Sequence, residues 1–191
     1  MKWTSCVVLL VASALPFAAS HGKMIVPEAE FVPGTAIITT FASTIEAAST
    51  NWPGKFDGDP TNNVAAFTAA FDNQKNAPGR WATLRAMIDS VVPGCGNTLL
   101  SVSPKPIPSD GKVQWTNTAT EGFTPSHTGP CEIWLDDTRV LQNDNCAGAY
   151  TDIPAHLAVD FSSCVGSCTI RFYWLALHQP TWQAYSTTIH M

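Results

Sequence analysis

Short β-prone runs separated by turn residues dominate the second half of the chain. In chain order they read KVQWT, CEIWLDD, CTIRFYWLAL and QAYSTTI. Runs of this length with alternating or continuous apolar positions are typical of strands, and CTIRFYWLAL, apolar almost throughout, is expected to be a central strand. The stretch from His21 to about Pro60, which contains the β-prone run TAIITTF, also favours strands and loops over helices.

Two segments between these regions carry a helical pattern instead. Asp59 and Pro60 are typical of a helix start, with an N-cap residue followed by proline, and Val64, Phe67 and Phe71 follow at helical spacing. The second segment, PGRWATLRAMIDSVV, also has apolar residues on one side and ends at a Pro-Gly pair. Both helices are expected as an insertion in an otherwise all-β fold.

The first twenty residues have the pattern of a secretory signal peptide. Lys2 is followed by the apolar run CVVLLVASALPF and then by small residues. Ser20 and Ala18 satisfy the preference for small side chains at the last position before the cut and two before it, so cleavage is expected before His21. The apolar run is too short to span a bilayer. We therefore expect a secreted protein with one domain over residues 21–191.

The cysteines and the turn-rich strands together predict the fold class. Once the leader is removed, five cysteines remain, and in a secreted chain they are expected to form two disulfides with one thiol left over. These are Cys95, Cys131, Cys146, Cys164 and Cys168. Sequence alone leaves their pairing open. We predict an all-β, immunoglobulin-like β-sandwich with a short helical insertion and disulfides.

Charge narrows the set of partners. Charged residues make up 13% of the chain and the formal net charge is −5. This favours neither a nucleic acid nor an anionic membrane as partner. It also gives no long-range attraction toward an acidic polymer. A monomer is the expected state.

Histidines are the candidate chemistry. His127 stands just before a strand in SHTGPCEIWLDD, and His178 stands at a strand end with Gln183 and Tyr185 on the following run. A mature chain that begins with His21 would place a free amine and an imidazole on one residue. Copper(II) prefers a tetragonal set of nitrogen ligands, which the amine and ring of His21 and the ring of His127 can supply.

Several other residues have ordinary structural explanations. His156 is expected in a turn without a partner pattern, and His190 lies beside the last residue of the chain. Adjacent strand residues such as Asp136 and Asp137 point to opposite faces, so a hard-cation site there is not expected. Cys164 and Cys168 have no matching second pair, and disulfides are preferred over zinc.

The histidine motifs resemble those of a known enzyme family. HGKMIVP after the leader, SHTGPCEIWLDD, NDNCA and FYWLALHQPTWQAY are similar to copper-dependent lytic polysaccharide monooxygenases, most closely the oomycete pectin-active family, auxiliary activity family seventeen. The resemblance implies a histidine brace of His21 and His127, with Tyr185 at the axial position. It implies that His178 and Gln183 hydrogen-bond the oxygen co-substrate. Trp182, between His178 and Tyr185, is the candidate sugar-stacking residue.

The resemblance also implies an activity. One copper ion, an external reductant, and dioxygen or hydrogen peroxide would cleave glycosidic bonds of a plant cell-wall polysaccharide, with pectin (homogalacturonan) as first choice. The mechanism needs no pair of carboxylates, unlike that of a glycosidase. Two other functions are compatible with the same residues: a secreted copper-binding protein with the brace but no oxidative activity, and a cell-wall or host-interaction protein.

Overall fold

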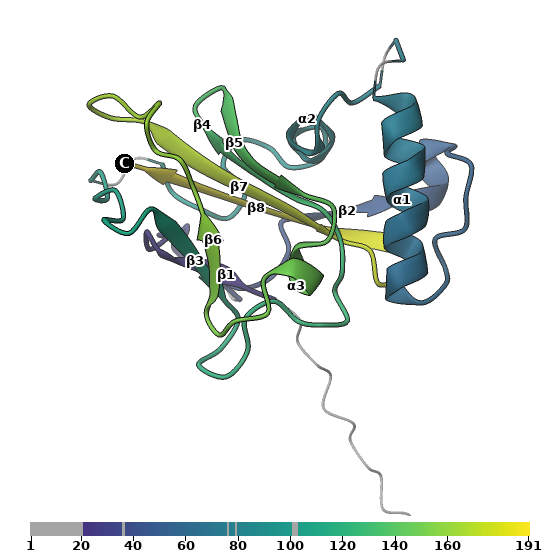
Figure 1. The fold of residues 1–191 in the computed structure, drawn as a ribbon, viewed down its shortest axis with the longest axis horizontal. Helices are drawn as coiled ribbons and strands as arrows, with labels where there is room; N and C mark the ends of the chain where they lie inside the picture. Colours follow the sequence, from purple (N-terminus) through teal and green to yellow (C-terminus); the bar gives the residue numbers. More distant parts are fainter. Residues whose placement is uncertain (1–20, 36, 76, 79, 101–102) are drawn as a thin grey trace, which may run out of the picture.

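Two antiparallel sheets face each other across an apolar core (Figure 1). The computed structural model describes residues 21–191 except 36, 76, 79 and 101–102. The smaller sheet has the strand order β1 (Lys23–Val26), β3 (Lys112–Thr116), β6 (Ala155–Ala158). The larger sheet has the order β2 (Ser43–Glu46), β8 (Thr181–His190), β7 (Thr169–Ala176), β4 (Cys131–Leu135), β5 (Thr138–Asn143). The expected β-sandwich is therefore confirmed.

Strand β7 lies in the middle of the larger sheet, as its nearly continuous apolar sequence predicted. Phe172 and Trp174 point toward the smaller sheet and join the core between the sheets. Tyr173 and Leu175 alternate with them and join a second core on the other face. A strand buried on both faces has no polar side, because successive side chains point in opposite directions.

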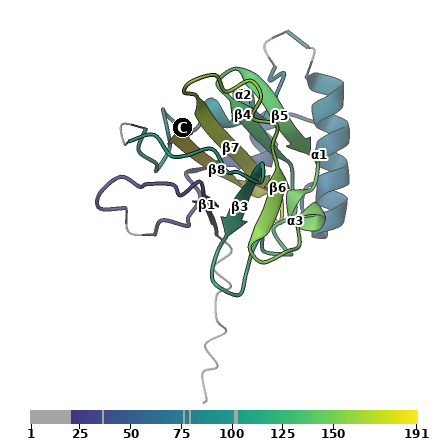
Figure 2. The same cartoon turned by 60° about the vertical axis from the view of Figure 1, so that its left-hand side comes forward.

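The second core lies under the helical insertion, on the outer face of the larger sheet (Figures 1 and 2). Its cover consists of η1 (Ala47–Thr50), α1 (Pro60–Gln74) and α2 (Leu84–Asp89). The predicted start of α1 is confirmed, because Asp59 caps it through bonds from the backbone N–H groups of Thr61 and Asn62. The insertion makes the fold three layers deep: small sheet, large sheet and helices.

The second helix is shorter than the sequence pattern predicted. Thr83 is its N-cap, in an extended conformation, and its hydroxyl accepts a bond from Ala86 N at 3.1 Å. The preceding chain is therefore not helical. Trp81, expected on the apolar side of this helix, instead lies edge-on to Trp52 with ring centroids 6.1 Å apart.

Two further expectations are corrected by the backbone. The run TAIITTF forms turns rather than a strand: Thr35 N bonds to Val32 O, and Thr40 N bonds to Ile37 O. Figure 2 shows this purple loop standing away from the sheets. His156, expected in a turn, lies in β6 opposite Gln114. β-Propensity alone did not predict either case, because strand formation depends on the partner that a segment meets.

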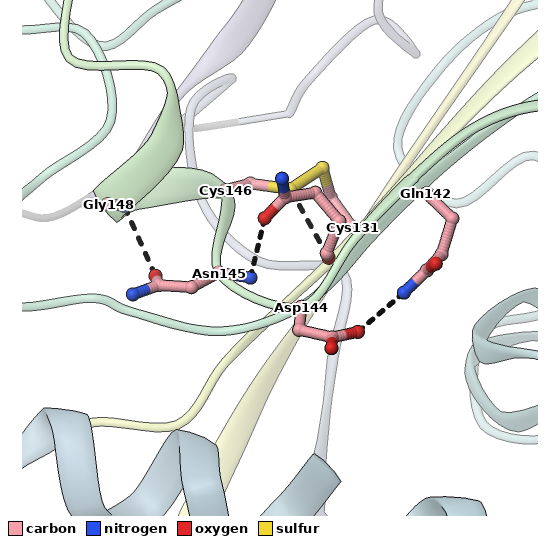
Figure 3. Close-up of a disulfide and its surroundings, with 7 residues drawn as sticks. Cys131, Gln142, Asp144, Asn145, Cys146 and Gly148 are labelled. Carbon is pink, nitrogen blue, oxygen red and sulfur yellow. Dashed lines mark hydrogen bonds between the residues drawn. A yellow bond between two sulfur atoms is a disulfide. The ribbon is translucent and has the colours of Figure 1, made fainter.

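Two disulfides form among the described residues, and Cys95 is the unpaired cysteine of that part of the chain. Cys131–Cys146 ties the start of β4 to α3 (Cys146–Ala149), and Cys164–Cys168 closes the short loop before β7. In Figure 3 the Asn145 side chain accepts from Gly148 N beside the first of these bonds. The expected count of two bridges and one thiol is confirmed.

No helix in the described ranges is long and apolar enough to cross a membrane.

Candidate metal centre

The loop before β4 continues the pairing with β7 beyond the ends of both strands. Leu175 N donates to Pro130 O at 3.0 Å, and Leu177 N donates to Thr128 O at 2.8 Å. These bonds bring the residue before Thr128 alongside the residue after Leu177. As a result the rings of His127 and His178 stack, with centroids 3.6 Å apart and an angle of 22° between their planes.

Gly129 allows this close approach of loop and strand. Its φ is +154°, and a Cβ atom at this position would lie 1.9 Å from Leu175 O. A side chain would therefore push the loop away from β7. The glycine of the SHTGP motif has a physical reason: His127, two residues before it, reaches His178 only if the backbone passes this point without a Cβ.

His21 is placed by the residue that follows it. Gly22 N donates to Thr39 O at 2.8 Å, and a Cβ on Gly22 would lie 2.3 Å from Trp115 Nε1. Gly22 thus lies against the Trp115 indole with no room for a side chain. The His21 ring, half-buried, lies edge-on to Phe41 with centroids 6.2 Å apart.

Tyr185 and Gln183 point to the same side of β8, as alternation along a strand requires. The Tyr185 hydroxyl donates to Gln183 Oε1 at 2.9 Å. The Tyr185 ring is buried, stacked on Trp174 with centroids 4.5 Å apart and edge-on to Phe41 at 6.4 Å. Phe41 therefore touches both Tyr185 and His21, which joins the β8 residues to the N-terminal residue.

Burial keeps the imidazoles neutral. The pKa of His127 is lowered to about 3, first by burial and then by the nearby charges of His178 and His21. Burial also lowers the pKa of His178 and of His21. Near neutral pH these rings therefore keep the lone pairs that a metal requires.

The ring nitrogens of His127 and His178 differ in their hydrogen bonds. Ser126 Oγ lies 3.1 Å from His127 Nδ1, which leaves Nε2 of that ring to act as a ligand. His178 Nδ1 is buried and has no hydrogen-bond partner among the residues that the structure describes. A buried polar atom without a partner is costly. Because this atom is buried and the His178 residue is partly exposed, a ligand from solvent could reach only the remainder of the ring.

This donor set fits copper. No group of three or more His, Cys, Asp or Glu side chains that could hold a metal is present in the described part of the chain. A brace does not require such a group, because a free amine on His21 would join two imidazoles as the third nitrogen. Three nitrogens and no carboxylate suit copper(II) better than magnesium or calcium, which prefer oxygen ligands.

The sugar-stacking role predicted for Trp182 is wrong. Its side chain has 0% exposed surface and lies in the second core, on the face of β8 opposite Gln183 and Tyr185. Trp52 and Phe56 pack against it, with ring centroids at 6.1 and 5.2 Å. Because Trp182 is close to the predicted turn between His178 and Tyr185, its ring was expected at the surface. Side chains alternate along β8, however, and this one points into the core.

Sequence reasoning missed the aromatic side of the site. Trp174 could have been found, because alternation from Phe172 along β7 places it on the face that meets Tyr185. Phe41 gave no such signal, because it follows a loop whose path no pattern predicted.

The chain matches no protein-family model, and no curated protein is significantly similar to it. The likeness to polysaccharide monooxygenases therefore rests on the sequence motifs alone.

Proposed function

We propose that this protein is a secreted, copper-dependent lytic polysaccharide monooxygenase that acts on a plant cell-wall polysaccharide, with homogalacturonan as the first candidate. The observation that supports the proposal is the stacked pair His127 and His178, which burial keeps neutral. The charge of His21 is among the causes that lower the pKa of His127, as expected if His21 and His127 share a site.

His21 and His127 would hold the metal. Cleavage after Ser20 converts the His21 nitrogen from a peptide nitrogen into an amine, which can form a chelate with its own ring. When bound, copper supplies one-electron chemistry that activates dioxygen or hydrogen peroxide toward a C–H bond beside the glycosidic link. An external reductant provides the electrons.

The remaining residues would orient the oxygen co-substrate and limit access to the metal. Tyr185, held against Trp174, limits access from one side, and burial raises the pKa of its phenol, so it stays protonated. Gln183 Oε1 accepts from Tyr185, so its amide nitrogen is the group that supplies a hydrogen bond to an oxygen co-substrate. The partly exposed ring of His178 is the second such group.

Secretion is part of the proposal. The two disulfides fit an oxidising compartment, where such bonds persist. The leader pattern of residues 1–20 lies outside the described residues, and the expected cleavage before His21 gives it a functional meaning: removing the leader creates the third nitrogen ligand.

Homogalacturonan is proposed on the motif resemblance, and the charge of the protein makes the choice testable. The net charge of −5 opposes long-range attraction to a polyanion. Binding to homogalacturonan would therefore rely on short-range contacts, and it should not weaken when salt is added.

Copper(II) EPR of two forms of the protein tests the proposal. One form begins at His21, and the other carries a single additional alanine before His21. An axial, nitrogen-rich signal only in the first form supports the brace. The same spectrum in both forms would exclude the amine as a ligand, and His127→Ala should abolish the signal while His156→Ala retains it.

Activity is tested separately, by mass spectrometry of oligosaccharides released from pectin. Oxidised products should require copper together with ascorbate, and none should form when either is omitted. A brace signal with no oxidised product from pectin, cellulose, xylan or chitin would instead favour a copper-binding protein without oxidative activity.

A further inference from the structure

The first turn of α1 contacts both segments that carry the stacked histidines. Thr128 Oγ1 donates to Pro60 O at 3.0 Å, and Asn63 Nδ2 donates to Leu177 O at 2.8 Å. Thr128 follows His127 in the chain, and Leu177 precedes His178. The helix is thus bonded to the neighbour of each ring.

These contacts close into a ring of hydrogen bonds. Leu177 N donates to Thr128 O at 2.8 Å, so Pro60, Thr128, Leu177 and Asn63 follow one another and return to Pro60 through the first turn of α1. We call these four residues the α1 clamp. Within it, both polar groups of the Leu177 peptide backbone are used, one by Thr128 and the other by Asn63.

Asn63 is the residue of the clamp that local structure alone would not require. It has 0% exposed surface, although asparagine is a poor residue for a helix interior. Both polar atoms of its side-chain amide are hydrogen-bonded: Nδ2 donates to Leu177 O, and Oδ1 accepts from Gly58 N at 2.9 Å. A buried side-chain amide bonded at one end to the segment just before α1 and at the other to the distant Leu177 holds these two segments in one arrangement.

The start of α1 is itself fixed, so the clamp has a rigid base. Asp59 accepts from the backbone N–H groups of Thr61 and Asn62, each at 3.0 Å, and Pro60 has no N–H to lose at the first position. The helical insertion is therefore anchored at the end where it meets the histidine segments.

We propose that Asn63 and Thr128 are positioning residues of the candidate copper site, and that the α1 clamp sets the separation and tilt of the His127 and His178 rings. The inference rests on the proposed function for its role in catalysis, but the clamp itself can be tested without copper. The outer helix thus acts on the site through the backbone carbonyl of Leu177 and the side-chain hydroxyl of Thr128.

The first experiment is NMR of the histidine ring protons in copper-free protein. Asn63→Leu keeps the size of the side chain and removes both of its bonds, and Thr128→Val removes only the hydroxyl. Each variant should move the ring-current-shifted resonances of His127 and His178, because the stack changes. Asn62→Leu is the matched control: Asn62 is the neighbouring amide, it is exposed, and its side chain donates to Asp59, so its loss should leave both histidines unchanged.

A purely structural role would lower the melting temperature without moving these resonances, and that result would overturn the proposal. Thr128→Val keeps the test possible if Asn63→Leu does not fold. In copper-loaded protein, Asn63→Leu should alter the EPR hyperfine splitting and reduce reductant-dependent turnover on the order of tenfold, the usual scale for residues that orient ligands. If wild-type protein shows no brace signal, the proposed function fails, whereas the copper-free spectra still decide the clamp.

Discussion

The rings of His127 and His178 lie face to face, with centroids 3.6 Å apart, although the two residues are in different segments of the chain. Two cationic imidazoles cannot share this position without strong repulsion. The stack therefore depends on both rings being neutral, and acid should disrupt it.

The free energy of unfolding of copper-free protein should decrease as the pH is lowered through a defined range. The folded-state pKa of His127 is lowered from 6.5 to about 3, so an unfolded chain binds a proton that the folded chain refuses. The free energy of unfolding should therefore decrease as pH falls from about 6.5 toward about 3, by up to about 1.4 kcal/mol per pH unit for this group. Urea unfolding at several pH values measures it.

His127→Gln removes the titrating ring and should flatten this dependence, and His127→Gln with His178→Gln should flatten it further, because burial lowers the pKa of His178 as well. An unchanged slope in both variants would mean that these histidines bind protons equally well in the folded and the unfolded chain.

Gly129→Ala should destabilise the protein strongly. The added Cβ would lie 1.9 Å from Leu175 O, so the loop must move away from β7 and take His127 with it. We expect a loss of more than about 2 kcal/mol in thermal or chemical unfolding, together with loss of copper affinity. Gly166→Ala is the matched control, because Gly166 also has positive φ but meets no atom within 4 Å. It should cost only about 1 kcal/mol and keep copper affinity.

Tyr185→Phe should separate stability from activity. The ring remains stacked on Trp174, and only the hydroxyl that donates to Gln183 is lost. The free energy of unfolding should change by about 1 kcal/mol, the usual net contribution of one hydrogen bond. Turnover should fall by a larger factor than this free energy corresponds to, because Gln183 loses the partner that orients its amide. Equal turnover of variant and wild type on pectin would contradict this role of the hydroxyl.

The two disulfides should contribute unequally. Cys131–Cys146 spans a sequence separation of 15, and Cys164–Cys168 spans 4. From loop-closure entropy, replacing each pair by alanine should cost about 3 and about 2 kcal/mol respectively. Replacing the first pair should also weaken copper binding, since Cys131 follows the loop that carries His127. If that variant bound copper normally, the bonds of the loop to β7 and α1 would be sufficient to hold it without the disulfide.

Much of the fold could be predicted from local pattern. The start of α1 was readable because Asp59 and Pro60 act locally, and β7 was readable because burial on both faces leaves a continuous apolar run. The start of the second helix and the path of residues 35–41 were not, because they depend on which partner the backbone meets.

The site shows the same division. SHTGP and LALH marked His127 and His178, and the structure brings their rings together. The side of a strand on which a side chain lies was harder to predict. Trp182 was expected at the surface, but it lies on the opposite face of β8 from Tyr185, in the core. Asn63 carried no signal at all, since its importance comes from Leu177, which lies 114 residues away in the chain.

The packing of Gly22 against Trp115 has a practical consequence for preparing the protein. Backbone atoms from Gly22 onward hold the N-terminal segment in place, through Thr39 and the indole, and nothing in that arrangement requires a free amine on His21. A sample with a leftover tag residue should therefore fold, melt and elute like the authentic one while lacking a ligand. Intact mass or N-terminal sequencing, rather than any measure of folding, is the quality control that an assay of this protein requires.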